Sequence, residues 1–313
     1  MPRIDAHVHL LPADYRAELE RRSLLPVELP RWSAELTYEL MERHDIDAAV
    51  MSLSPPGVSF GDQGLANELA RLVNERTAEL VSSAPERFAG LAVLPLPDVD
   101  AALAELRHAL DVLGLDGVAL LSNVGGTYLG DPAWDAVFDE LDHRGAYVFL
   151  HPTMPPHAPP LPQHPVWLYE FPFDTTRAVV NLIYSGTLER CPNLRLQVAH
   201  VGGTAPFLAH RLASLAAREP ERATGAPAGA LAHLRRLYYD TGLSNNTVAL
   251  AATLEVADIG QVVFGTDWPY ADLPQAGDPA PGLAGLTDGD RARIDASNIA
   301  ALVPRLAPQE VSR

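Results

Sequence analysis

The first apolar run of the chain ends in two histidines with one residue between them, His7 and His9. Side chains two residues apart on a strand point to the same face, so both imidazoles can reach one metal ion. Three further apolar runs end in His151, His200 and Asp267. Imidazole nitrogens and carboxylate oxygens are common protein ligands of divalent metals. These five residues therefore favour metal binding, provided that the fold brings them together.

Short apolar runs alternate with amphipathic helical stretches along the whole chain, which is the pattern of βα units around a parallel sheet. We predict eight strands, at Ile4 to His9, Ala48 to Ser54, Phe88 to Pro95, Gly117 to Ser122, Tyr147 to His151, Leu194 to His200, Leu237 to Thr241 and Val262 to Asp267. Predicted helices lie between them, at Ala34 to Arg43, Leu65 to Ala84, Ala101 to Leu113, Pro132 to Arg144, Thr175 to Leu188, Pro206 to Ala217 and Thr247 to Ala257. Eight strands with intervening helices favour a closed (β/α)₈ barrel over an open sheet.

Active sites of such barrels lie at the C-terminal ends of the strands, where all five polar residues stand. A single histidine at a strand end is more often a hydrogen-bonded structural residue than a ligand. A group of four histidines and one aspartate on one barrel face is different. Burying so many unpaired polar groups would be costly without a ligand between them. We therefore predict one metal site built from this group.

Two segments exceed the minimal repeat, residues 12–30 after the first strand and residues 152–172 after the fifth. Both follow a strand, so we expect both to lie over the barrel mouth. The second contains the run PTMPPHAPPLP, whose prolines disfavour a helix or central strand and predict a stiff covering loop. Such a loop is either a lid over the site or a passive connector. A third stretch, Ala223 to Gly229, is predicted to be a plain surface loop.

Composition favours one large domain spanning residues 1–313, because α/β barrels of this length are common. The formal net charge of −17 disfavours nucleic acid and anionic membranes as partners and favours small molecules. Cys191 is the only cysteine, so no intrachain disulfide can form, and neither a signal peptide nor a membrane span is visible. We expect a cytoplasmic protein. Arginine accounts for all 23 of the lysine and arginine residues, and lysine is absent.

The chain resembles the amidohydrolase superfamily, and within it the branch of aminocarboxymuconate-semialdehyde decarboxylase and the aromatic-acid decarboxylases of 6-methylsalicylate and γ-resorcylate. The resemblance extends over essentially the whole chain. Its segments are Ile4-Asp5-Ala6-His7-Val8-His9, Phe149-Leu150-His151-Pro152, Phe173-Asp174-Thr175-Thr176, Ala199-His200-Val201-Gly202-Gly203-Thr204-Ala205-Pro206-Phe207 and Phe264-Gly265-Thr266-Asp267-Trp268-Pro269. It implies a TIM barrel of the metal-dependent hydrolase type, with insertions after strands one and five, and a homodimer.

The resemblance also implies a metal held by His7, His9, His151 and Asp267. His200 would be the catalytic acid/base beside it, acting with metal-bound water. Zinc is the expected ion and manganese the alternative, since the donor set is compatible with both. Many hydrolytic members of the superfamily bridge two metals with a carboxylated lysine, which a chain without lysine cannot do. One divalent ion is therefore expected, and mononuclear members are frequently decarboxylases.

We accordingly predict a metal-dependent carboxy-lyase that acts on a small aromatic or unsaturated carboxylic acid. The carbon that bears the carboxylate must gain a proton before CO₂ leaves, and either His200 or Asp267 could deliver it. We favour His200. Trp167, Phe171 and Asn123 are candidates to contact the substrate, with packing against the barrel rim as their structural alternative.

The partner of the substrate carboxylate is left open by the sequence. Arginine often binds carboxylates through its bidentate fork. The muconate decarboxylase has an arginine on the helix after the first strand, where this chain has Thr37. A second arginine of that enzyme, which crosses the dimer interface, falls one residue from Arg218. These differences make a hydroxybenzoate such as a methylsalicylate competitive with a carboxymuconate as substrate.

Two other functions are compatible with the same residues. A mononuclear hydrolase would use these ligands to open a lactone or an amide, with His200 as the base. A non-catalytic binding barrel is the second alternative, and it predicts a missing metal ligand where none is missing. Release of CO₂ from hydroxybenzoates would distinguish a decarboxylase from both.

Overall fold

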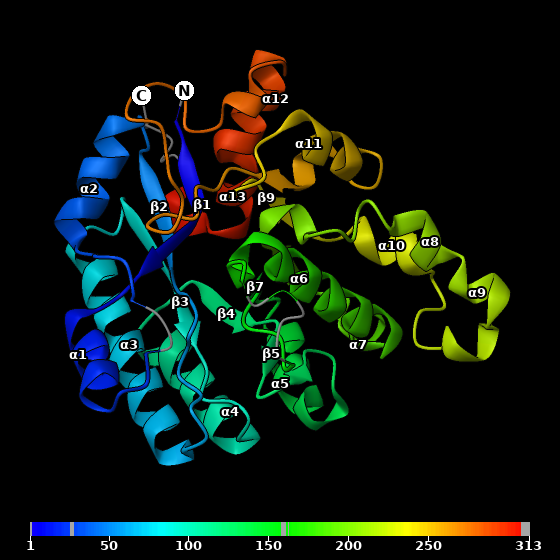
Figure 1. Ribbon diagram of the computed structural model, residues 1–313, viewed down its shortest axis with the longest axis horizontal. Coiled ribbons are helices and arrows are strands. Elements are labelled where there is room, and N and C mark those ends of the chain that lie inside the picture. The colour runs from blue at the N-terminus through cyan, green and yellow to red at the C-terminus, as the bar shows by residue number, and fades with distance from the viewer. Residues whose placement is uncertain (1, 26–27, 158–160, 162, 308–313) are drawn as a thin grey trace.

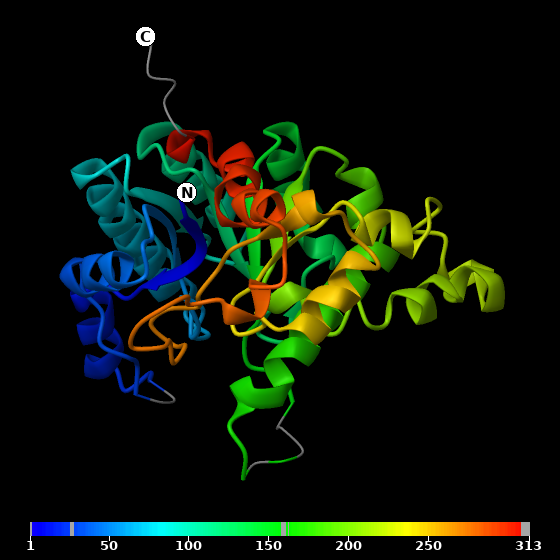
Figure 2. The same cartoon turned by 90° about the horizontal axis from the view of Figure 1, so that it is seen from above.

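The computed structural model describes residues 2–25, 28–157, 161 and 163–307. Eight parallel strands form a barrel in chain order, with helices around it (Figure 1; Figure 2). The strands are β1 (Ile4–Leu10), β2 (Ala48–Leu53), β3 (Phe88–Val93), β4 (Gly117–Leu121), β7 (Tyr147–His151), β8 (Arg195–Val198), β9 (Tyr238–Asp240) and β10 (Val262–Val263). The predicted (β/α)₈ barrel is confirmed.

Backbone hydrogen bonds join the first strand to the chain that follows β10, which closes the barrel. The amide of Asp267 donates to the carbonyl of His7 at 2.8 Å, and the amide of His9 donates to the carbonyl of Trp268 at 2.8 Å. Val8 and Trp268 form a parallel bridge between these two bonds. The barrel wall therefore fixes the backbone of three of the predicted site residues.

Helices cover the outside of the barrel. They are α1 (Ala13–Arg21), α2 (Ala34–Arg43), α3 (Gln63–Ser83), α4 (Val99–Arg107), α5 (Asp135–His143), α6 (Val166–Tyr184), α7 (Thr187–Arg190), α8 (Ala209–Ala213), α9 (Leu215–Arg218), α10 (Ala230–Leu234), α11 (Thr247–Leu254), α12 (Asp288–Ala292) and α13 (Asn298–Leu302). Asp62 begins the longest of them, α3, by accepting a hydrogen bond from the amide of Leu65. Apolar side chains such as Leu182 of α6 and Val148 of β7 fill the layer between helices and strands. Burial of this layer holds the strand ends in fixed relative positions.

The proline-rich segment after β7 differs from the prediction. The sequence predicted a covering loop as far as residue 172 and a helix from Thr175, whereas α6 begins at Val166 and contains Pro172. Pro165 stands just before the helix, where a missing N–H removes no helical hydrogen bond. Pro172 removes the bond to the carbonyl of Leu168, a residue that is 57% exposed and open to water. Residues 158–160 and 162 lie outside the described part of the chain.

The segment after β1 is also more helical than predicted, because α1 lies inside residues 12–30; residues 26–27 are outside the described part. Several predicted bounds were wrong. The strands β8 and β10 are shorter than predicted, the helix predicted at 206–217 is divided into α8 and α9, and α4 gives way to a π-helical turn at His108–Val112. Consequently His200 and Asp267 lie just beyond their strands rather than within them.

A short antiparallel hairpin follows β4 at the C-terminal end of the barrel strands. It consists of β5 (Asn123–Val124) and β6 (Thr127–Tyr128). In the described residues, we find no helix whose length and apolar character would let it cross a bilayer.

Candidate metal centre

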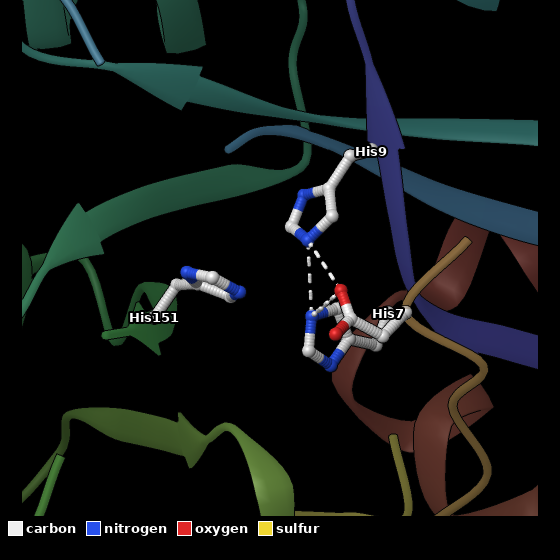
Figure 3. Close-up of side chains that lie close together, drawn as sticks. His7, His9 and His151 are labelled. Atoms are coloured by element: carbon white, nitrogen blue, oxygen red, sulfur yellow. Dashed lines mark hydrogen bonds and ion pairs between the residues drawn. The ribbon is translucent and has the colours of Figure 1, made fainter. Parts of the chain in front are cut away.

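Four side chains meet at the C-terminal end of the barrel. His7 and His9 come from β1, His151 ends β7, and Asp267 follows β10. Each offers one ligand atom, and the four atoms all lie within 4.8 Å of one another. Figure 3 shows the three imidazoles turned toward one another. All four residues are at most 4% exposed, so the group lies away from bulk water.

Two of the imidazoles have their Nδ1 atoms bonded to oxygen acceptors outside the group. His7 Nδ1 lies 3.0 Å from Asp240 Oδ1, and His151 Nδ1 lies 2.7 Å from the carbonyl oxygen of Pro152. Ionised carboxylate and carbonyl oxygens accept but do not donate, so each Nδ1 carries the proton. In the neutral form of each ring, the Nε2 atom is left with a free lone pair.

The third imidazole completes this arrangement. His9 Nδ1 lies 3.1 Å from Ser52 Oγ and 3.3 Å from the carbonyl oxygen of Ser52. The hydroxyl donates its proton to the carbonyl of Val8, so both oxygens accept from Nδ1, and Nε2 is left with a lone pair. His9 Nε2 then lies 3.1 Å from His7 Nε2 and 3.0 Å from Asp267 Oδ1, and His151 Nε2 is buried with no hydrogen-bond partner among the described residues. Lone pairs and a carboxylate facing one another repel unless a cation lies among them. These residues therefore fit a divalent metal ion.

Asp240, the last residue of β9, links this group to the rest of the barrel and was not identified from the sequence. Its Oδ1 accepts hydrogen bonds from His7 Nδ1 at 3.0 Å, from the amide of His200 at 3.1 Å and from the amide of Gly242 at 3.0 Å. Its Oδ2 accepts one from Gln197 Nε2 at 2.9 Å. A carboxylate behind a ligating histidine fixes the ring and raises its basicity. Asp240 could have been found by the signal that identified the others, a polar residue at a strand end.

The buried carboxylates and imidazoles of this group shift one another's pKa values. Burial lowers the pKa of His7, but the carboxylates of Asp240 and Asp267 reverse this and raise it to about 10. Burial raises the pKa of Asp267, but its histidine neighbours bring it well below its usual range. Burial and the neighbouring His9 and His7 lower the pKa of His151 well below its usual value. An ionised Asp267 and a neutral His151 are the forms that bind metals. The raised pKa keeps His7 protonated in the metal-free chain, so a bound cation would displace the proton from its Nε2.

His200 lies beside the group of four ligand atoms. Its Nε2 is 3.2 Å from Asp267 Oδ2, and because an ionised carboxylate accepts, this nitrogen carries a proton. Its backbone φ is 55°, that of Val201 is 50°, and that of Asp267 is 66°. Left-handed backbone is strained for residues other than glycine, above all for a β-branched valine. The fold therefore holds both His200 and Asp267 in strained positions that turn their side chains toward each other.

The three predicted substrate contacts have different surroundings. Phe171 stands edge-on to His151, with ring centroids 6.4 Å apart. Trp167, on the same helix, is 58% exposed. Asn123 is buried, and its side-chain nitrogen donates to Asp174 Oδ2 at 3.0 Å. The structure thus brings Phe171 toward the metal group, whereas the amide of Asn123 is already occupied.

An aromatic residue near the group was missed by the sequence analysis. The ring of Tyr270 lies edge-on to His9, with centroids 5.6 Å apart, and its hydroxyl lies 3.5 Å from the carbonyl oxygen of Pro55. Burial raises the pKa of Tyr270 to about 12, so the hydroxyl is neutral at physiological pH. The signal available was its position three residues after Asp267, at the mouth of the barrel.

Comparison with known proteins agrees with this geometry. A family model described as amidohydrolase matches residues 4–305. The 6-methylsalicylic acid decarboxylase of Penicillium expansum is 34% identical over 281 residues, which cover 87% of this chain and 86% of that protein. The 2-amino-3-carboxymuconate-6-semialdehyde decarboxylase of Dictyostelium discoideum is 29% identical over 296 residues, covering 86% and 82%. A crystal structure of an amidohydrolase II superposes with a TM-score of 0.87 at 29% identity, over 96% of this chain and 99% of that one. With the family model matching nearly its whole length, the chain belongs to the amidohydrolase family.

Proposed function

We propose that this chain is a metal-dependent carboxy-lyase that removes CO₂ from a small aromatic or unsaturated carboxylic acid. The observation that carries the proposal is the convergence of three imidazole lone pairs, from His7, His9 and His151, on the carboxylate of Asp267. The curated relatives described above are decarboxylases, which favours a lyase over a hydrolase of lactones or amides.

His7, His9, His151 and Asp267 would hold one divalent ion. Imidazole suits zinc and carboxylate suits harder ions, so we propose zinc, with manganese as the competing ion. When bound, the ion supplies Lewis-acid polarisation of a carboxylate or hydroxyl oxygen of the substrate. Elemental analysis of the purified protein should find about one metal ion per chain. A protein that takes up neither zinc nor manganese after reconstitution would contradict the proposal.

His200 would be the residue that transfers the proton. Its Nε2 atom lies 3.2 Å from Asp267 Oδ2, at the edge of the ligand group, so Asp267 orients the imidazole. In the proposed reaction a proton adds to the carbon that bears the carboxylate, and the bond between that carbon and the carboxylate then breaks. Its electron pair returns to the ring or double bond as CO₂ leaves. Asp267 is the competing proton donor.

Replacing His200 with alanine tests this assignment. The variant should keep its metal content and release CO₂ about 10²- to 10⁴-fold more slowly, as loss of a general acid predicts. His210→Ala is the matched control, because His210 is an exposed histidine on α8. Loss of metal from His200→Ala, measured by elemental analysis, would make His200 a ligand instead.

The substrate would be a hydroxybenzoic acid of the methylsalicylate type rather than a carboxymuconate. Identity is higher with the 6-methylsalicylic acid decarboxylase, at 34%, than with the muconate enzyme, at 29%. Phe171, edge-on to His151, would pack against a flat ring, while Trp167 and Asn123 stay predicted contacts. CO₂ release should be fastest with 6-methylsalicylate in a panel of hydroxybenzoates and muconates. Ring opening of lactones without CO₂ release would contradict the assignment.

A homodimer would cover the apolar side chains that are exposed at the start of α6 and after β8. Trp167, Leu168, Phe173 and Phe207 are 58%, 57%, 45% and 80% exposed, and Figure 2 shows the start of α6, in green, projecting from the barrel. Apolar patches of this kind often mark interfaces. Light scattering should give the mass of a dimer for the wild type and of a monomer for Phe207→Ser. Val112→Ser, at a residue 70% exposed elsewhere, is the control, and a monomeric wild type would contradict the proposal.

A further inference from the structure

Asp174 of α6 is a fully buried carboxylate outside the metal group. Three side chains donate hydrogen bonds to it, namely Ser122 Oγ, Asn123 Nδ2 at 3.0 Å and Tyr128 OH at 2.5 Å. The guanidinium of Arg177 lies 3.6 Å away and balances its charge. Burying a carboxylate is unfavourable unless it is satisfied in this way. Because all three donors belong to the segment that follows β4, Asp174 holds this segment against α6.

Ser122 connects Asp174 to the residues at the end of β7. Its hydroxyl proton is donated to Asp174, so only oxygen lone pairs remain, and one accepts the amide of Thr153 at 3.0 Å. The backbone amide of Ser122 donates to the carbonyl of His151 at 2.8 Å. A single residue therefore holds the chain on both sides of Pro152.

The carbonyl of Pro152 and the amide N–H of Thr153 belong to one planar peptide group, in which they point in opposite directions. The hydroxyl of Ser122 fixes the N–H, and this aims the carbonyl at His151 Nδ1, 2.7 Å away. Rotation of this peptide would remove the acceptor that keeps the proton on Nδ1. His151 Nε2 could then gain the proton and could not bind a cation.

We propose that Asp174 is a positioning residue for metal binding, which acts through Ser122 and the 152–153 peptide to keep the Nε2 lone pair of His151 free. The inference rests on the proposed metal centre. It predicts that metal affinity depends on a carboxylate that does not belong to the ligand group.

The test compares zinc affinities of metal-free protein, measured by competition with a chromophoric chelator. Asp174→Asn and Ser122→Ala should each weaken zinc binding about tenfold, the lower end of the range for partners behind a ligand. The double variant should bind zinc no more weakly than the single variant with the lower zinc affinity, because both substitutions act through the same peptide group. Glu105→Gln is the control. Glu105 is a buried carboxylate of α4 that accepts hydrogen bonds from Asn74 and Arg71, and this variant should bind zinc like the wild type.

Thermal unfolding of the metal-free variants shows whether a loss of zinc affinity is accompanied by a loss of stability. Ser122→Ala leaves the carboxylate in place, so it carries the test if Asp174→Asn does not fold. ¹⁵N NMR of His151 should show Nδ1 protonated in the wild type and a mixture of tautomers in Ser122→Ala. Two results would overturn this proposal and leave the proposed function intact. One is a variant that binds zinc as tightly as the wild type, and the other is a double variant whose loss of zinc affinity equals the sum of the two single losses. A wild type that binds neither zinc nor manganese would overturn it together with the proposed function.

Discussion

Replacing Asp240 with asparagine should weaken metal binding although every proposed ligand stays in place. The carboxylate receives hydrogen bonds from His7 Nδ1, from the amides of His200 and Gly242, and from Gln197 Nε2, at 2.9 to 3.1 Å. Asparagine has nearly the same shape, but it replaces one acceptor oxygen with an NH₂ donor and removes the negative charge.

The size of the effect follows from these contacts. If the new amide nitrogen occupies the Oδ2 position, it faces the donor of Gln197, and one unsatisfied buried donor costs about 1–3 kcal/mol of unfolding free energy. If it occupies the Oδ1 position, it faces three donors and the bond to His7 is lost. In either case His7 loses its charged partner. Loss of such a partner weakens metal binding about 10- to 100-fold, or about 1.4–2.8 kcal/mol.

Zinc affinity of the metal-free chain, measured against a competing chelator, checks this prediction. Glu105→Gln is the control, because Glu105 is a buried carboxylate of α4 that has its own partner, Asn74, and does not belong to the metal group. Unfolding by denaturant in the presence of chelator measures the stability loss separately. A folded Asp240→Asn variant with wild-type zinc affinity would refute the idea that Asp240 prepares His7 for the metal, as would an equal loss in the control.

Gly242→Ala should weaken zinc binding in the same assay, because an added Cβ would lie 2.7 Å from His7 Nδ1. Gly285→Ala is the control and should bind zinc like the wild type, because no atom lies within 4 Å of an added Cβ there. Equal zinc affinities of the two variants would contradict this steric argument. Removing the metal should lower the melting temperature by several degrees, since an ion at 100 times its Kd adds about 2.7 kcal/mol of stability, and calorimetry of the chelator-treated protein measures the shift. An unchanged melting temperature after confirmed metal loss would show that the ion does not stabilise the native protein. Burial raises the pKa of the Cys191 thiol from 9.0 to about 11, so a thiol reagent at pH 8 should label the folded chain far more slowly than the urea-unfolded chain. Because the thiol of the unfolded chain loses its proton at a lower pH, the stability of the fold should fall as the pH rises from 9.0 to about 11. Cys191→Ala should reduce that fall. A thiol that titrates near 9.0 in the folded chain would disprove the effect of burial.

The barrel and the metal group could be predicted because both depend on patterns that are local in sequence. Strands and helices alternate along the chain, and parallel strands place their C-terminal ends on one face. Once His7, His9, His151 and Asp267 were recognised as residues at strand ends, their proximity followed from the topology. The strand ends also included His200, and it was the family resemblance that separated His200 from the four ligands. The structure groups the same four.

The proline-rich segment could not be assigned correctly from composition. Its prolines disfavour a helix, but Pro165 stands before α6 and Pro172 faces a carbonyl whose residue, Leu168, is exposed. The cost of a proline depends on what replaces the lost hydrogen bond, and solvent access decides that. Trp167 and Phe171 therefore lie on a helix rather than on a loop.

Local pattern was thus enough to predict the barrel and the five polar residues at its strand ends, whereas the choice of four of them as ligands came from the family resemblance. The nitrogen of each imidazole that faces the centre is set by contacts that form only in the folded chain. That choice depends on acceptors far away in the chain, such as Asp240, which lies 233 residues from His7, and on the orientation of single groups such as the carbonyl of Pro152. A hydrogen bond forms only when the distance between donor and acceptor is correct to within a few tenths of an ångström and the angle is close to linear. The pattern of strands in the sequence specifies neither quantity.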